Sequence, residues 1–98
     1  MSNKQFPSGL QAVLWSKSLN NLDIDRDKNY IINQVLAFGF LEHLQWLFKI
    51  YPKEIVRKTF LNNPIRTYSV KSLDFIKLIL FGKKQVDLDE KKYVQHSL

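Results

Sequence analysis

The chain has 98 residues, of which 45% are hydrophobic and 13% aromatic, and its formal net charge is +6. This length predicts one domain, and the apolar fraction is sufficient for a small core. The sequence has no cysteine, which excludes disulfides, thiolate zinc sites and cysteine nucleophiles. No apolar signal region opens the chain, and no run approaches the roughly 18 apolar residues of a membrane span. We therefore expect a soluble cytoplasmic protein.

The positive charge is concentrated in the second half of the chain. Residues 1–48 have balanced charges, whereas residues 49–84 contain nine lysines and arginines and two acidic residues. Such a field favours a polyanion or an acidic protein surface as partner.

Three regions differ in composition along the chain. Residues 1–9 predict a flexible arm, residues 10–82 a helical domain, and residues 83–98 a charged tail. We expect the tail to be frayed, unless its apolar residues form a short docking helix: Val86, Leu88, Tyr93 and Val94. Within the domain, residues 10–19 predict a short helix or an extended strap, with Trp15 packed across the helices that follow.

The next segment is acidic. Asp23, Asp25 and Asp27 alternate along it, and alternating carboxylates are typical of calcium loops. However, Lys28 and Gln34 stand where such a loop needs its glycine and its glutamate. We expect these aspartates to cap and favourably charge the N-terminus of the following helix.

The stretch from Tyr30 to Tyr51 predicts a helical hairpin that forms the centre of the core. Apolar residues recur at helical spacing on both sides of Gly39. We expect this glycine to end the first helix in a left-handed conformation.

Two further helices are predicted after the hairpin. Pro52 suits the first turn of a helix that ends at Asn62. Ser69 caps the last helix, residues 70–81, and Gly82 closes it. This last helix is apolar on more than one face, so it either crosses the core or presents its second face to another chain. The candidate partner-binding residues are Phe75, Leu78 and Phe81.

No arrangement of side chains points to a reaction. His43 lies on a helix without a second histidine or a carboxylate at metal-ligand spacing, and His96 lies in the tail. Glu42 and Glu54 are single acids on different helices, so their spacing does not assemble an acid/base pair. We expect a surface or boundary role for His43, no enzymatic activity, and no metal or cofactor.

A helix-turn-helix is the alternative functional hypothesis. Residues 41–51 would be its first helix and residues 53–61 its reading helix, with Tyr51-Pro52 as the turn. The turn lacks the usual glycine, and the outer face of the reading helix has no Asn, Gln or Ser before Asn62. Attraction to phosphates is therefore better supported than base reading. The candidate nucleic-acid-binding residues are Lys53, Arg57, Lys58, Arg66 and Lys71.

Several motifs in a fixed order resemble a family of small bacterial proteins. They are Leu14-Trp15, Leu22-Asp23, YIINQVLAFG at 30–39, LEHLQWLFKIYPKEIVRKTF at 41–60 and FIKLILFG at 75–82. The family typically carries LFWD, LD, FIIERVLEYG, DWRWL and YG, and an aromatic-rich final helix. The resemblance covers about residues 13–82. Ser16 and Pro52 depart from it, standing where the family has an aspartate and a glycine.

Members of that family are often encoded beside nucleotidyltransferases of the AbiEii/AbiGii toxin class. The resemblance implies a non-enzymatic, antitoxin-like protein that binds and restrains such a toxin, and it leaves open whether the protein also touches DNA. We thus expect an all-α, single-domain bundle of four or five helices that binds a protein partner. The alternative is a helix-turn-helix DNA-binding regulator, and the sequence leaves monomer and homodimer open.

Overall fold

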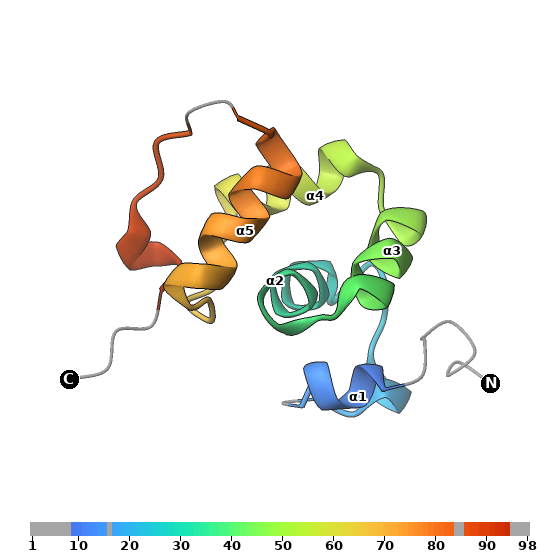
Figure 1. Cartoon of the computed structure of the whole chain (residues 1–98). Helices are drawn as coiled ribbons and strands as arrows, with labels where there is room; N and C mark the ends of the chain where they lie inside the picture. Colours follow the sequence, from blue (N-terminus) through green and yellow to red (C-terminus); the bar gives the residue numbers. More distant parts are fainter. Residues whose placement is uncertain (1–8, 16, 84–85, 95–98) are drawn as a thin grey trace.

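The computed structural model describes residues 9–15, 17–83 and 86–94, and within them the fold is all-α (Figure 1). The five α-helices are α1 Leu10–Val13, α2 Lys28–Phe38, α3 Leu41–Ile50, α4 Lys53–Asn62 and α5 Val70–Phe81. Two 3-10 turns, η2 Leu19–Asn21 and η3 Glu90–Lys92, complete the order. The expected small bundle of four or five helices is therefore confirmed.

Helix α2 is the centre of the bundle. Figure 1 shows it end-on, and α1, α3, α4 and α5 all pack against it. Six consecutive α2 residues, from Ile31 to Leu36, are buried, as expected for a helix covered on every side. The predicted helix pair of residues 30–51 is present as α2 and α3, but the element shared by the whole core is α2 alone.

Gly39 does not adopt the left-handed conformation expected of it. It ends α2 with φ −70° and ψ 153°, which is extended backbone. A Cβ atom at this position would lie 2.6 Å from the Val35 carbonyl oxygen and 3.0 Å from His43 Cβ. The glycine is therefore required because the first turn of α3 approaches the last turn of α2 closely.

The boundaries of α4 and α5 follow the predicted signals. Pro52 is the N-cap of α4, one residue earlier than expected. The Ser69 hydroxyl accepts a hydrogen bond from the Ser72 amide at 3.1 Å, and Gly82 ends α5 with φ +67°. The inner face of α5 is buried, and its opposite face is exposed. Helix α5 thus fills the core on one side and meets solvent on the other.

The prediction of a frayed tail is wrong for residues 86–94. Tyr93 and Val94 are buried in the core. The Tyr93 hydroxyl donates to the Phe60 carbonyl at 2.7 Å, and the Tyr68 amide donates to the Tyr93 carbonyl at 2.9 Å. The segment docks through a 3-10 turn and not an α-helix, and the aromatic rings of Phe60, Tyr68 and Tyr93 pack together there. Residues 1–8 of the expected flexible arm, and residues 84–85 and 95–98 of the tail, lie outside the described residues.

Trp15 is not packed across the helices as predicted. Its side chain is 56% exposed and meets the ring of Phe38 edge-on, with ring centroids 4.7 Å apart. The short α1 instead anchors itself through Leu10, Val13 and Leu14, which are buried. In the part of the chain that the structure describes, no helix is both long and apolar enough to cross a membrane.

Candidate binding surfaces

A buried polar side chain of α2 holds the loop between α4 and α5. The Asn33 amide donates to the carbonyl oxygens of Asn29, at 2.9 Å, and Asn63, at 3.1 Å. Its own oxygen accepts from the Tyr68 hydroxyl at 2.7 Å. Buried polar groups that are fully paired fix their surroundings in one arrangement. Asn33 therefore sets where the chain emerges from α4.

Gln34, the next residue, makes a second set of links. Its amide nitrogen donates to the Val13 carbonyl at 3.2 Å, and its oxygen accepts from the Thr67 hydroxyl at 2.8 Å. The central helix is thereby tied to both α1 and the segment before α5. The apolar pattern of the sequence does not predict these hydrogen bonds, because Asn33 and Gln34 are polar residues that interrupt it.

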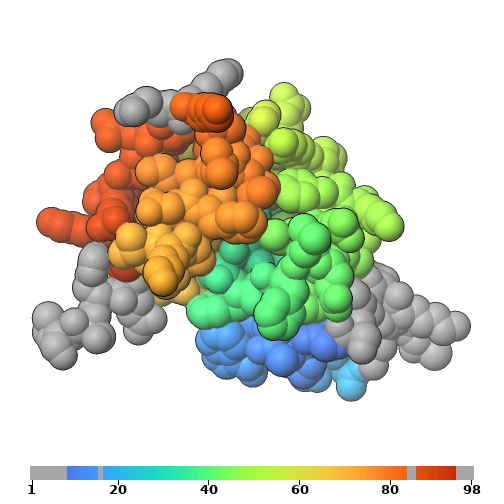
Figure 2. Space-filling view, viewed as in Figure 1, coloured from blue at the N-terminus to red at the C-terminus, as the bar shows by residue number. Residues whose placement is uncertain are grey.

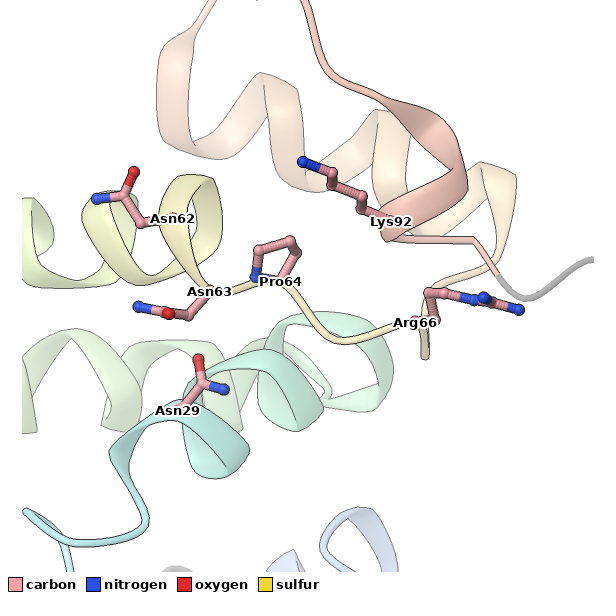
Figure 3. Close-up of a pocket in the computed structure, with 6 residues that line it drawn as sticks. All are labelled: Asn29, Asn62, Asn63, Pro64, Arg66 and Lys92. Carbon is pink, nitrogen blue, oxygen red and sulfur yellow. The ribbon is translucent and has the colours of Figure 1, made fainter.

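Next to these buried polar side chains lies a groove, which we call the amide groove. It consists of two adjoining hollows of about 500 and 230 Å³ that share Asn29, Asn62 and Asn63. Pro64, Arg66 and Lys92 complete the larger hollow, and Lys28, Ile55, Lys58 and Thr59 complete the smaller one. In Figure 3 the side chain of Asn29 points toward Asn63, and Lys92 extends over Pro64.

The amide groove is positively charged. Its four cations are Lys28, Lys58, Arg66 and Lys92, and no carboxylate is among the lining residues. No ion pair between described residues involves any of the four. The cations come from α2, α4, the loop before α5 and the 86–94 segment. The fold therefore gathers charge from parts of the chain that are distant in sequence.

The five predicted nucleic-acid-binding residues are divided by the structure. Lys58 and Arg66 line the two adjoining hollows. Lys53 and Lys71 are exposed near the N-termini of α4 and α5 and line neither hollow.

Arg57, the remaining predicted residue, has a structural contact. Its Nε donates to the Leu80 carbonyl at 2.7 Å, and its guanidinium lies 6.0 Å from the centre of the Phe81 ring. A carbonyl in the last turn of α5 is thus paired by a cation, as helix C-termini favour. The helical pattern turned Arg57 outward from α4 but could not show that α5 lies there.

Sequence reasoning missed the other groove residues. The sequence indicates a helix end at Asn62-Asn63-Pro64, and it places Lys28 and Asn29 at the end of the acidic segment that precedes the next helix. The available sequence signal for the groove was the pair of asparagines beside the proline that follows the helix. The proximity of this pair to Asn29 and Lys92 could not be predicted, because it depends on tertiary packing.

A second candidate surface is apolar. Phe75 and Leu78 on α5 are 50% and 54% exposed, whereas Phe81 is half-buried against Phe60. At the corner between α2 and α3, Phe40 and Leu41 are 72% and 68% exposed. Figure 2 shows α5, in orange, and this corner, in green, on one face of the molecule. Of the predicted partner-binding residues, Phe75 and Leu78 are thus available to a partner, and Phe81 mainly packs inside.

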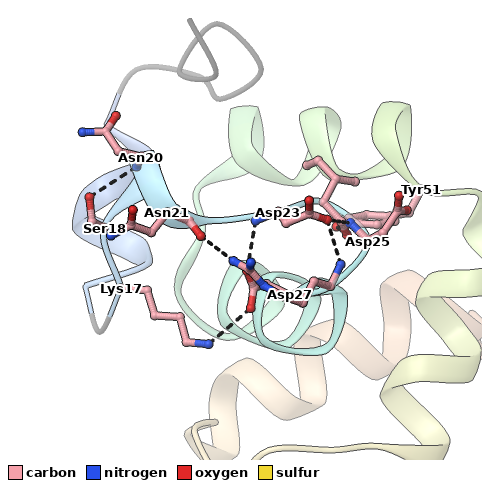
Figure 4. Close-up of polar contacts among 10 residues, drawn as sticks. Lys17, Ser18, Asn20, Asn21, Asp23, Asp25, Asp27 and Tyr51 are labelled. Atoms are coloured by element: carbon pink, nitrogen blue, oxygen red, sulfur yellow. Dashed lines mark hydrogen bonds and ion pairs between the residues drawn. The ribbon is translucent and has the colours of Figure 1, made fainter.

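The acidic segment forms a local network (Figure 4). The Asp27 carboxylate is buried and accepts from the Arg26 guanidinium at 2.8 Å, the Asp23 amide at 2.9 Å and the Lys17 ammonium at 3.3 Å. These donors, the Arg26 guanidinium first, lower the pKa of Asp27 to about 2. Asp27 occupies the N-cap position of α2, yet its side chain makes no capping bond there.

Asp23 makes the turn before α2, accepting from the amides of Arg26 and Asp25, and these bonds lower its pKa. The Tyr51 hydroxyl donates to the Ile24 carbonyl at 2.7 Å. Burial, with the nearby aspartates, raises the pKa of Tyr51. The segment therefore braces α2 against the end of α3, and among the described residues no cluster suited to a metal ion occurs.

His43 is buried, at 2% exposed, and not at the surface or boundary as expected. Its Nδ1 accepts from the Phe40 amide at 3.0 Å, which pairs an N–H group at the start of α3. Gly9 and Gly39 both lie close to this ring or its Cβ. The role of the histidine is thus to start α3 within a crowded corner.

Comparison with known proteins places the chain in a family. Residues 10–60 match the model of a family described as "Family of unknown function (DUF6922)". The chain belongs to the DUF6922 family. No curated protein matches it, and no solved structure does.

The DUF6922 segment ends inside α4, at Phe60. It contains Lys28, Asn29 and Lys58 of the amide groove and the exposed α2–α3 corner. Asn62, Asn63 and the whole of α5 lie beyond it. Each candidate surface therefore combines residues from within the family segment with residues that follow it.

Proposed function

We propose that this chain is a non-enzymatic, antitoxin-like binding protein that docks through α5 onto a nucleotidyltransferase toxin and restrains it. The observation that supports docking is the outer face of α5. Phe75 and Leu78 lie half-exposed there, although the inner face of the same helix already fills the core. An exposed apolar stripe on a helix with a buried opposite face fits a protein interface better than a free surface.

The energy available from this face is modest but sufficient for anchoring. Full burial of one such side chain contributes about 1.5–3 kcal/mol, so the exposed halves of Phe75 and Leu78 contribute roughly 1 kcal/mol each. Phe40 and Leu41 on the same face would extend the contact. These side chains would therefore supply part of the binding free energy, and other residues of the interface would supply the rest.

The identity of the partner rests on the resemblance to proteins encoded beside AbiEii/AbiGii-type toxins. The charge of +6 is consistent with an acidic partner surface and would speed association with it.

The test is a nucleotidyl-transfer assay of the cognate toxin with increasing amounts of this protein. We expect inhibition near equimolar protein, and the double variant Phe75→Ser/Leu78→Ser should need at least tenfold more protein. Asp74→Ser, on the exposed side of the same helix, is the matched control and should inhibit like the parent. Toxin activity unchanged by a molar excess of the parent chain would reject neutralisation.

A helix-turn-helix DNA-binding regulator is the second candidate. It is favoured by Lys53 and Lys58, which are exposed on α4; Arg57 is engaged by α5. This function requires preference for one duplex sequence, measured by competition at a fixed salt concentration. Equal binding to random duplex would remove it.

A further inference from the structure

We infer that the amide groove binds the phosphodiester backbone of single-stranded nucleic acid. This inference goes beyond the protein-docking function, since it concerns another surface and another class of ligand.

Charge is the first observation. Four cations from four parts of the fold line the adjoining hollows without a carboxylate. Gathering like charges opposes folding unless an anion relieves it. A backbone with one negative charge per nucleotide supplies several such anions in a row, and its binding releases counterions.

The amides are the second observation. The Asn33 N–H that donates to the Asn29 carbonyl at 2.9 Å is shared with the Asn29 side-chain oxygen at 3.2 Å, which leaves the Asn29 NH₂ group as the end that can donate to a ligand. In the described part of the chain, the side-chain amides of Asn62 and Asn63 have no hydrogen bond to protein atoms. Side-chain amides are common donors to phosphate and sugar oxygens.

Shape decides between a duplex and a single strand. Proteins that read duplex DNA usually insert a protruding helix or strand pair into a groove of the duplex. The site here is itself a groove, and single strands bind in positively charged grooves that follow the backbone. No aromatic side chain is among the described residues that line it, so bases would not be stacked and sequence preference should be weak.

The groove is also held in place before a ligand arrives. Asn33 fixes the Asn63 carbonyl from below, and Tyr93 fastens the segment that carries Lys92 to Phe60. A site that needs little rearrangement loses less free energy on binding.

The groove and the apolar corner lie at opposite ends of the central helix. Lys28 and Asn29 begin α2, whereas Phe38 ends it. At 1.5 Å per residue the helix is about 16 Å long. The two surfaces can therefore be tested separately.

The experiment is fluorescence anisotropy of the full chain with labelled oligouridine and oligothymidine of about 12 nucleotides. With four cations engaged, we expect log K to fall against log salt with a slope of about −3, from about 0.7 per phosphate contact. The variant Lys28→Ser/Lys92→Ser should lose at least tenfold in affinity, and its slope should flatten by about 1.4. Binding of either oligonucleotide with this profile supports the inference.

The matched control is Lys49→Ser/Lys83→Ser, which removes the same charge from exposed positions outside the groove and should change affinity less than twofold. Equal losses in the two variants would mean a diffuse field and overturn the inference, as would tighter binding to a duplex of the same length. Phe75→Ser/Leu78→Ser should leave oligonucleotide affinity intact, and Lys28→Ser/Lys92→Ser should leave toxin inhibition intact. Each of the two functions can therefore fail its own test without changing the result of the other test.

Discussion

Replacing Asn33 by leucine should destabilise the protein strongly, although leucine has a similar size and is apolar. Asn33 is fully buried in α2. The substitution leaves the buried Tyr68 hydroxyl and the Asn63 carbonyl without this partner. Each unpaired buried group costs about 1–3 kcal/mol, and the gain from burying the leucine offsets part of this. We expect a net loss of about 2–4 kcal/mol, out of a typical total of about 5–15 kcal/mol.

A double-mutant cycle isolates the bond between Asn33 and Tyr68. Tyr68→Phe alone should cost about 1–2 kcal/mol, because the Asn33 oxygen loses its donor. In the double variant neither group remains unpaired, so the combined loss should be smaller than the sum by about 1–2 kcal/mol. Urea unfolding followed by far-ultraviolet circular dichroism gives these free energies.

Tyr93→Phe provides the control for this cycle. Its hydroxyl donates to the Phe60 carbonyl and not to Asn33, so its loss should add to that of Asn33→Leu within about 0.5 kcal/mol. The reasoning would be refuted if Asn33→Leu and Tyr68→Phe also proved additive within that limit, since the two side chains would then not form the bond.

Three further substitutions test other parts of the fold. Asp27→Asn should lower stability at neutral pH. The folded pKa of Asp27 is about 2 and its ordinary value is 3.8. In the parent, the carboxylate therefore contributes to the free energy of unfolding above about pH 4, and this contribution disappears as the pH falls toward 2. The stability of the variant should change less with pH over this range. Gly39→Ala should cost about 1–3 kcal/mol, measured by urea unfolding, because its methyl group meets the Val35 carbonyl at 2.6 Å; a loss under about 0.5 kcal/mol would contradict the close approach. Arg57→Ala should cost about 1 kcal/mol of stability by loss of its bond to Leu80 and leave oligonucleotide affinity unchanged. A tenfold loss of affinity would instead mean that Arg57 takes part in nucleic-acid binding.

The helix boundaries could be predicted because local chemistry determines them. Ser69 supplies a hydroxyl for the free amides of the first turn of α5, and Gly82 adopts the positive φ that ends it. Pro52 and Asn62 mark α4 in the same way. These signals act within one turn of the chain, so the sequence contains them in full.

Side-chain environments were less predictable, because they depend on packing between distant elements. Gly39 looked like a conformational signal, yet its role is steric and comes from α3 lying against α2. His43 has the spacing of a surface residue but is buried beneath the same corner. Trp15 is large and apolar, yet α1 ends before it and leaves it largely exposed.

The candidate surfaces were predicted only in part, because they too depend on packing between distant elements. Phe75 and Leu78 were found because helical spacing separates two faces of α5. Lys58 was found by its charge, but its neighbours in the groove were not, because Asn29 and Lys92 are 63 residues apart in the sequence. Their meeting follows from the docking of residues 86–94, which the sequence left open only as an alternative to a frayed tail.

The position of Tyr93 has a consequence for synthesis on the ribosome. The ring of Phe60 is covered by Tyr68, Phe81 and Tyr93, and Tyr93 follows Phe60 by 33 residues. At about 5–20 residues per second, roughly 2–7 s separate the translation of these two positions. During that interval the aromatic cluster around Phe60 cannot be completed. Slow codons between positions 60 and 93 would lengthen this interval without changing the protein made.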